Sequence, residues 1–173
     1  TFYITFFTFN ILTTWWVKYA SLFGAVAAIV CNALFMAIVF LLFYLTKRRL
    51  GNRLGYVALI AYWVAFEYFH MRWDLSWPWL TLGNGFAGWP LMIQWYEFTG
   101  VLGGTVWILV CNILLYEVLV AKLNAPAQPR RKRLVTLALL IAIPVAYSCI
   151  RYYTYREDHD PVSIAVIQPN IDP

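Results

Sequence analysis

The chain has 173 residues, of which 62% are hydrophobic and only 12% are charged. Because a soluble domain is about half apolar and about a quarter charged, this composition excludes an ordinary soluble protein and indicates a membrane protein. The net charge of +5 lies mostly in short loops that offer no exposed basic fold, so nucleic acid is not an expected partner.

Five apolar segments are predicted to be membrane helices. They are residues 1–16, 22–45, 54–69, 101–121 and 134–150. The second is apolar for 24 residues except for Asn32. At about 1.5 Å per residue, a helix of this length is longer than the roughly 30 Å hydrocarbon core requires. We interpret the first as the later part of a span, and we expect the chain to belong to a longer protein.

Two basic clusters follow the second and fourth apolar segments. Their members are Lys47, Arg48, Arg49, Arg53, Lys122, Arg130, Arg131, Lys132 and Arg133. Short loops rich in Lys and Arg are typical of the cytoplasmic side of a membrane protein. Both clusters are therefore predicted to face the cytoplasm, on one side of the bilayer.

Residues 73–100 form the longest stretch that is neither a clean span nor a basic loop. They contain five of the nine tryptophans: Trp73, Trp77, Trp79, Trp89 and Trp95. Trp collects at membrane interfaces, where its apolar ring and its polar N–H are both satisfied. Because glycines and prolines interrupt the stretch, we predict a folded interfacial loop rather than one helix. It lies on the side opposite the basic clusters.

The C-terminal part has a different pattern. Residues 151–161 are polar and aromatic and are predicted to be a linker, whereas residues 162–167 are rich in β-branched residues and precede Gln168-Pro169-Asn170. That pattern predicts the first strand of an extramembrane domain. The expected fold is therefore an α-helical polytopic bundle of about five spans over residues 1–150, followed by the start of an α/β domain in residues 162–173.

One group of titratable residues invites a chemical interpretation. Glu67, His70 and Asp74 are spaced so that they would share one face of a helix. The group could be a metal or proton-relay site, since ionisable groups at membrane depth are costly and tend to be functional. We prefer the alternative that they reach interfacial water and pair with Arg72 or Lys18.

Other polar residues within or near the apolar segments have a simpler explanation. They are Asn10, Asn32, Gln94, Glu97 and Asn112, and we expect them to form hydrogen bonds between helices rather than to bind a ligand. The three cysteines lie in apolar runs without metal-ligand spacing, so we interpret them as small buried residues. We expect no metal and no cofactor.

Several motifs, taken in their order and spacing, resemble the apolipoprotein N-acyltransferase family as found in Bacteroidetes-type bacteria. The residues concerned are Asn10, Thr14, Trp15, Trp16, Glu67, Trp77, Pro78, Trp79, Leu80, Leu82, Gly83, Asn84, Gln94, Trp95, Tyr96, Glu97, Thr99, Gly100, Gly103, Gly104, Trp107 and Asn112. The closing residues 166–171, Val-Ile-Gln-Pro-Asn-Ile, resemble the first strand of that family's nitrilase-like domain. The resemblance covers nearly the whole chain.

The resemblance implies a multi-pass enzyme of the bacterial inner membrane that takes part in lipoprotein biosynthesis. It would move an acyl chain from a phospholipid, typically phosphatidylethanolamine, to the N-terminal diacylglyceryl-cysteine of an apolipoprotein. It would use nitrilase-like covalent catalysis, in which a Glu base activates a Cys nucleophile and a Lys stabilises the oxyanion. The C-terminal domain would be periplasmic, above a bundle that admits both lipids from the bilayer.

The resemblance assigns no catalytic residue in this chain. The family's Glu, Lys and Cys lie in the nitrilase-like domain, after the strand predicted at residues 162–167. Neither the three cysteines of this chain nor Glu67 and Glu97 match those positions, so we expect the chain alone to be inactive. The candidate substrate-binding residues are Trp73, Trp77, Trp79, Tyr96 and Glu97, with anchoring of the loop at the interface as the alternative role of each.

Two other functions remain open at this point. A transporter or channel segment would require polar residues that face each other at mid-bilayer or broken helices in repeated halves, and only Asn32 and Asn112 favour it. A membrane anchor for a soluble nitrilase-like amidase would make the spans purely structural. It predicts that substitutions across residues 73–97 have no effect on activity.

Overall fold

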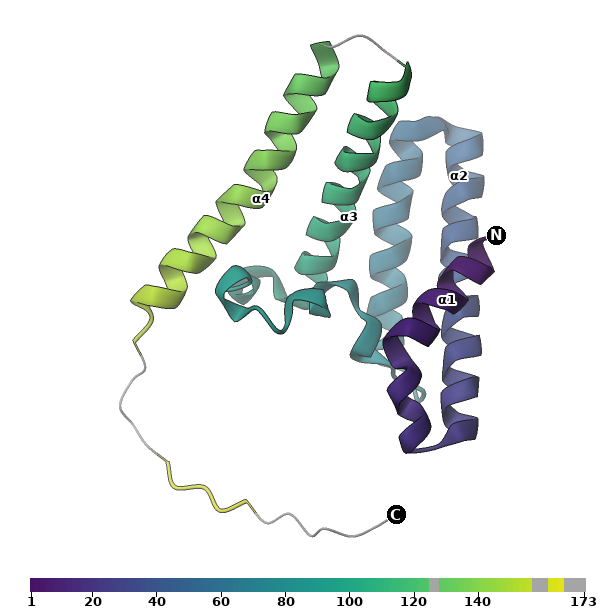
Figure 1. Ribbon diagram of the computed structural model, residues 1–173, viewed down its shortest axis with the longest axis vertical. Helices are drawn as coiled ribbons and strands as arrows, with labels where there is room; N and C mark the ends of the chain where they lie inside the picture. The colour runs from purple at the N-terminus through teal and green to yellow at the C-terminus, as the bar shows by residue number, and fades with distance from the viewer. Residues whose placement is uncertain (125–127, 157–161, 167–173) are drawn as a thin grey trace.

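The computed structural model describes residues 1–124, 128–156 and 162–166. All regular secondary structure within these ranges is helical (Figure 1). The elements are α1 (Phe2–Thr14), η1 (Trp15–Tyr19), α2 (Leu22–His70), η2 (Pro78–Leu80), η3 (Leu82–Phe86), η4 (Pro90–Met92), α3 (Tyr96–Asn124) and α4 (Gln128–Thr154). Three helices are long and apolar enough to cross a membrane, in α2, in Tyr96–Leu119 and in Arg131–Thr154. The protein is therefore a membrane protein, as its composition predicts.

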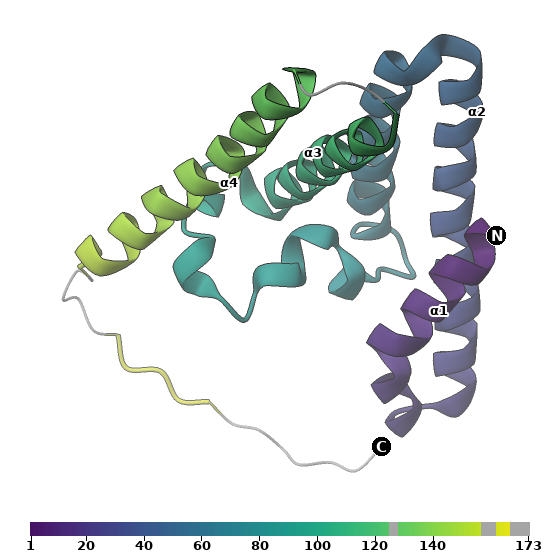
Figure 2. The same ribbon diagram turned by 45° about the horizontal axis from the view of Figure 1, so that its top comes forward.

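Helix α2 is a hairpin of two antiparallel arms. It contains 49 residues and bends at Gly51, whose positive φ of 84° favours glycine because that residue has no Cβ. We call residues 22–50 the first arm and residues 52–70 the second arm (Figures 1 and 2). Two of the predicted spans are thus confirmed as helices that lie side by side. The basic loop predicted between them is shorter than expected, since the helix continues on both sides of a turn centred on Gly51.

The first predicted span is a short helix. Helix α1 has 13 residues, so the described helix is only about 20 Å long at about 1.5 Å per residue. That is shorter than the roughly 30 Å hydrocarbon core. Among the described residues, three helices are thus long and apolar enough to cross a membrane. The predicted count of about five spans is not shown.

Helices α3 and α4 form a second antiparallel pair. Trp107 Nε1 donates a hydrogen bond to the Leu140 carbonyl oxygen at 2.8 Å, and Arg133 lies 3.3 Å from Glu117. Gly100 bends the first turn of α3 with a φ of 64°, and α4 contains Pro144. Helix α4 begins before and ends after the predicted span of residues 134–150.

The core joins α1, both arms of α2, α3 and the Trp-rich segment of residues 73–100. Its buried centre consists of Met36, Val39, Trp63 and Leu109. Partly buried residues from α1 and from the Trp-rich segment, including Phe6 and Leu82, pack against it. The Trp-rich segment is therefore part of the folded bundle.

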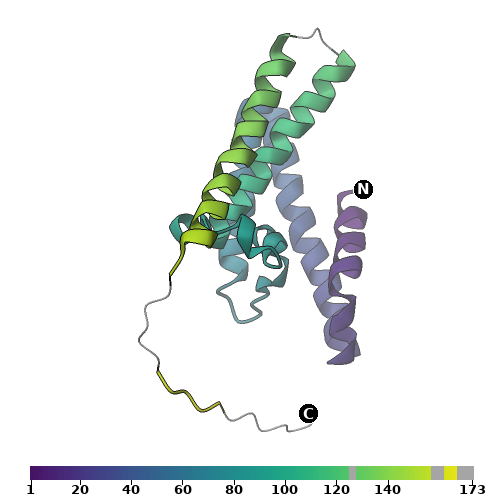
Figure 3. The same ribbon diagram turned by 60° about the vertical axis from the view of Figure 1, so that its left-hand side comes forward.

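The bundle has two chemically different ends. The turn of α2, with its basic residues, lies at the same end as the close of α3 and the start of α4 (Figures 1 and 3). We call this the basic end. The Trp-rich segment lies toward the other end, where its three 3₁₀ helices connect α2 to α3. This arrangement agrees with the two faces predicted from the sequence.

The predicted strand is not observed among the described residues. Residues 162–166 are exposed and have no regular secondary structure, and residue 167 lies outside the described ranges. A strand requires a partner for its backbone hydrogen bonds, and the described part of the chain supplies none here. The linker predicted for residues 151–161 begins later than expected, because α4 continues to Thr154. The start of an α/β domain therefore stays a prediction.

Candidate functional site

A buried carboxylate ties the Trp-rich segment to the bundle. Glu67, near the end of α2, is only 3% exposed. Its Oε1 atom accepts hydrogen bonds from Trp63 Nε1 at 2.9 Å and from the Leu82 amide at 2.8 Å, while its Oε2 atom accepts one from the Thr105 hydroxyl at 2.6 Å. Three donors from α2, η3 and α3 thus meet at one side chain. Such full satisfaction is what allows a polar group to be buried.

The start of η3 packs directly on α3. The Gly83 amide donates a hydrogen bond to Thr105 Oγ1 at 3.0 Å, and the Tyr96 hydroxyl donates one to the Gly83 carbonyl oxygen at 3.0 Å. A Cβ atom added to Gly83 would lie 2.0 Å from the Val101 carbonyl oxygen. Glycine is therefore required here by the close approach of two backbones.

We expect Gly83→Ala to destabilise the protein by about 2 kcal/mol, the middle of the range for overpacking a tight site. The added methyl group would separate η3 from α3 and weaken the hydrogen bonds around Thr105. Gly85→Ala is the matched control, because nothing lies within 4 Å of a Cβ atom at that position. Thermal unfolding in detergent compares the two variants, and equal melting temperatures would contradict the close approach.

A pocket of about 370 Å³ lies between the first arm of α2 and the start of the Trp-rich segment. Its walls are mostly apolar, and small residues of α2 leave the space open. The lining residues are Gly24, Ala27, Ala28, Cys31, Asn32, Phe35, His70, Trp73, Leu75, Ser76 and Trp77. The size lies at the lower end of the range of about 300–1,000 Å³ that is usual for ligand pockets.

Three N–H donors of this lining have no hydrogen-bond partner within the described part of the chain. They are Asn32 Nδ2, Trp73 Nε1 and Trp77 Nε1, and all three atoms are buried. Asn32 is otherwise fixed, because its Oδ1 atom accepts a hydrogen bond from His70 Nε2 at 2.9 Å. Since buried donors in proteins are almost always paired, three unpaired donors on residues that line one apolar pocket are an unusual feature of this part of the bundle.

The pocket and the Glu67 cluster share a wall. A second cavity, about 10 Å³ in volume, is lined by the pocket residues Asn32, His70 and Trp77 and also by Glu67 and Thr81. A space of this size is close to the roughly 10–15 Å³ that one water molecule needs. Glu67 and three of the residues that line the pocket therefore border the same small space.

The structure places the five candidate substrate-binding residues in three different settings. Trp73 and Trp77 line the pocket. Trp79 is 61% exposed and packs edge-to-face against Trp16, with ring centroids 5.9 Å apart. Tyr96 is half-buried and holds η3 through its bond to Gly83. Only two of the five candidates thus come together in one cavity.

Glu97, the fifth candidate, lies at the junction of α3 and α4. It is exposed, and its carboxylate contacts the Tyr147 hydroxyl and Arg151 Nε, the latter at 3.3 Å. Glu97 thus joins α3 to α4, as expected. Asn32 also bonds between helices as expected, because its partner His70 lies on the other arm of α2. Asn112 and Gln94 differ from that expectation, because each donates to a carbonyl oxygen four residues earlier.

The group of Glu67, His70 and Asp74 is not a shared site. Helix α2 ends at His70, so Asp74 lies in the following turn and is exposed. The preferred pairing with Arg72 or Lys18 is also wrong. Glu67 is bonded to uncharged donors. The Arg72 guanidinium contacts the ring and hydroxyl of Tyr68, and Lys18 lies over the rings of Trp15 and Tyr19.

Sequence reasoning missed several residues that build the pocket. Cys31, expected to be buried, is exposed at the pocket wall. Ala27 and Ala28 carry no signal in sequence beyond their small size. Thr105 could have been found only as the hydroxyl that directly follows Gly103-Gly104, which is a weak signal.

The comparisons with known proteins agree on one family. The family described as "Apolipoprotein N-acyltransferase N-terminal domain" matches residues 1–114. A curated apolipoprotein N-acyltransferase of Chlorobaculum tepidum is 30% identical over 167 residues, which is 95% of this chain and 31% of that protein. The one of Geobacter metallireducens is 32% identical over 134 residues, which is 75% of this chain and 25% of that protein. No solved structure matches.

These matches cover only part of each relative. The chain spans less than a third of the length of the two curated relatives. The matched region begins at residue 1 and includes the α2 hairpin, the Trp-rich segment and the first part of α3. The pocket and the Glu67 cluster both lie inside it.

Proposed function

Because this chain belongs to the apolipoprotein N-acyltransferase family, we propose that the protein containing it is an acyltransferase of lipoprotein maturation. It moves an acyl chain from a membrane phospholipid to the N-terminal diacylglyceryl-cysteine of apolipoproteins. These two lipids and the surrounding bilayer are its partners. The relatives do not favour the alternative of a transporter or channel segment.

In this proposal the described chain supplies the lipid-admitting bundle, and the chemistry lies elsewhere in the protein. A Glu, a Lys and a Cys of a nitrilase-like domain that begins at residues 162–173 carry the two acyl-transfer steps. The thiolate first takes the acyl group from the phospholipid, which leaves as the lysolipid, and the amine of the acceptor then takes it from the thioester. The domain lies on the periplasmic face of the inner membrane, above about five spans.

The observation that carries the role of this chain is the pocket with its three unpaired N–H donors. Its apolar walls suit one acyl chain, and the donors suit the ester oxygens at the head of that chain. Trp73 and Trp77 combine both properties, since an indole has an apolar body and a polar N–H. We infer that the pocket holds the end of the acyl chain nearest the headgroup, on the side of the bundle where the active site would sit.

The proposal is tested with the full-length protein in vesicles that contain phosphatidylethanolamine. A synthetic diacylglyceryl-cysteine peptide is the acceptor, and mass spectrometry follows the addition of one acyl chain to its amino group. We expect N-acylation with matched release of the lysophospholipid. A protein that leaves the peptide unchanged, although it is folded and in the membrane, would contradict the proposed activity.

A substitution that fills the pocket tests the role of this chain. Ala28→Phe would place a ring in the space between α2 and Trp73, and we expect the rate of N-acylation to fall at least about tenfold, because small displacements of a substrate from its reactive position are costly. Val26→Phe is the control, since Val26 is 55% exposed and does not line the pocket. Equal activity of the two variants would mean that the pocket does not admit the substrate.

A further inference from the structure

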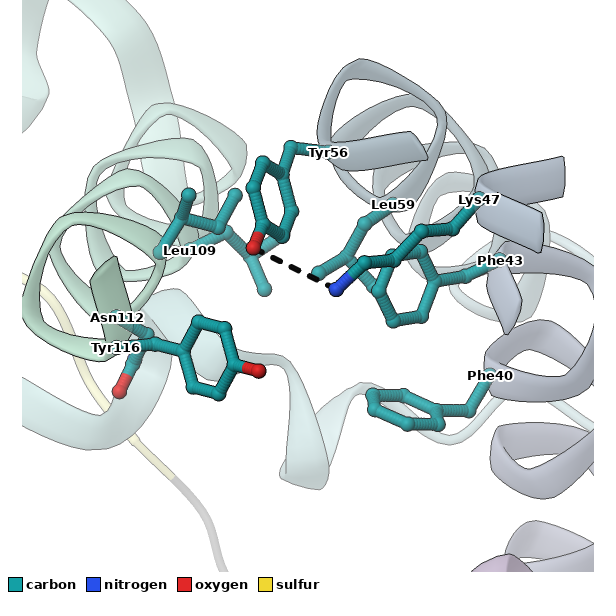
Figure 4. A pocket seen from close by; sticks show the side chains of 9 residues that line it. Phe40, Phe43, Lys47, Tyr56, Leu59, Leu109, Asn112 and Tyr116 are labelled. Atoms are coloured by element: carbon teal, nitrogen blue, oxygen red, sulfur yellow. Dashed lines mark hydrogen bonds between the residues drawn. The ribbon is translucent and has the colours of Figure 1, made fainter. Parts of the chain in front are cut away.

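A separate apolar cavity lies at the basic end of the bundle, away from the Trp-rich segment. It has a volume of about 290 Å³ and is enclosed by both arms of α2 and by α3 (Figure 4). Its lining is Phe40, Phe43, Lys47, Tyr56, Leu59, Leu109, Asn112, Ile113 and Tyr116. Asn112 and Tyr116 are exposed, so the cavity reaches the outer surface of the bundle.

One cation points into this cavity. The Lys47 ammonium lies over the rings of Tyr56, Tyr116 and Phe43, at 4.7, 5.4 and 5.7 Å from their centroids (Figure 4). Its hydrogen-bond contact is the Tyr56 hydroxyl, at 3.5 Å. An ammonium group has three donors, and no carboxylate forms an ion pair with it among the described residues. Lys47 therefore retains capacity for an anion.

The position of Lys47 is built into the hairpin. A Cβ atom added to Gly55 would lie 2.6 Å from Lys47 Cβ and 2.8 Å from its Cα atom. The two arms therefore approach closely at this point, and Gly55 is buried. A lysine near the end of a membrane helix usually extends toward water. Here the arms are in close contact at Gly55, and the Lys47 side chain runs across the ring of Tyr56 instead of extending toward water.

We propose that this cavity binds an anionic phospholipid of the basic-end leaflet. The phosphate contacts Lys47, and the upper part of an acyl chain lies against Phe40 and Leu109. Charge complementarity supports this occupant, because Arg48, Arg49 and Arg53 surround the same turn and attract anionic headgroups. The apolar lining supports an acyl chain rather than a free phosphate ion. The proposal does not depend on acyl transfer, since the site lies at the opposite end of the bundle from the Trp-rich segment.

Retention of lipid by the full-length protein tests the proposal. The detergent-purified protein is mixed with phosphatidylglycerol or with phosphatidylcholine of the same acyl chains, and native mass spectrometry counts the bound lipid. We expect preferential retention of phosphatidylglycerol. Lys47→Gln should weaken that retention roughly tenfold, the size expected for losing one charge-assisted hydrogen bond. Arg49→Gln, an exposed neighbour that does not line the cavity, should change it less than about twofold by the same comparison.

A second variant keeps the test decisive if Lys47→Gln fails to fold. Ile113→Trp leaves every cation in place and fills the cavity, so it should also abolish the preference for phosphatidylglycerol. Equal losses in the Lys47 and Arg49 variants would show that the basic surface attracts the lipid without a defined site. Unchanged retention in Lys47→Gln or in a folded Ile113→Trp variant would overturn the proposal.

Discussion

Replacing Glu67 by alanine is expected to lower the free energy of unfolding by on the order of 3 kcal/mol or more, the largest stability effect of any single change discussed. The substitution removes the acceptor of three buried donors, from Trp63, Leu82 and Thr105. Each would be left unpaired in an apolar interior, which costs far more than the net value of the bonds themselves. Because these donors come from three elements, the Trp-rich segment should also detach from α3.

Two variants serve as controls for this result. Glu67→Gln keeps one oxygen acceptor for Trp63 and Leu82, so we expect a loss of only about 1 kcal/mol, that of one disturbed hydrogen bond. Glu117→Gln removes a half-exposed carboxylate that pairs with Arg133, and it should change stability by no more than about 1 kcal/mol. Thermal unfolding in one detergent ranks the three proteins. Equal stability of the Glu67→Ala and Glu117→Gln variants would contradict the structural role of Glu67.

Replacing Trp77 by alanine is expected to produce the largest loss of activity, roughly 10- to 100-fold in the rate of N-acylation, as for other changes that misplace a bound substrate. Trp77 lines the pocket, and its buried indole N–H is one of the three unpaired donors. Removing the ring takes away both the wall that would orient the acyl chain and the donor at its head. The bond between Asn32 and His70 does not involve this ring, so the rest of the pocket should persist.

Tryptophans of the same segment provide matched controls. Trp89 is 67% exposed and does not line the pocket, so Trp89→Ala should keep nearly the full rate. Trp79 lies outside the pocket beside Trp16, and we expect its substitution to have a smaller effect than that of Trp77. Initial rates with the diacylated peptide measure the difference. Similar losses at all three positions would indicate that these side chains only anchor the segment at the interface.

The arrangement of the helices could largely be predicted from the sequence. Long apolar runs determine which segments lie in the membrane, because apolar side chains transfer favourably into lipid. Basic turns determine which helix ends lie together, because charged side chains stay out of lipid. The α2 turn lies in the predicted gap between residues 45 and 54, but its position within that gap was not predicted, since the residues from Thr46 to Arg49 are compatible with either a helix or a loop. Gly51 decides it through a backbone angle that no periodicity reveals.

The pocket could be predicted only in part. Two of the five candidates, Trp73 and Trp77, line the pocket, but the three candidate tryptophans are chemically alike in sequence and differ only in what they pack against. Trp73 and Trp77 face the small residues of the first arm of α2, whereas Trp79 faces Trp16. That distinction arises from contacts between residues far apart in the chain. The role of Glu67 was missed for the same reason, because two of its three donors lie 15 and 38 residues away.

Photocrosslinking of the full-length protein with a phospholipid that carries a diazirine near the start of one acyl chain would test the central claim most directly. The account predicts that labelled peptides cluster on the first arm of α2 around Ala28 and on the segment with Trp73 and Trp77. It also predicts that Ala28→Phe removes this label while Val26→Phe retains it. Label spread evenly over the exposed face of α4, with none in the pocket, would contradict the account.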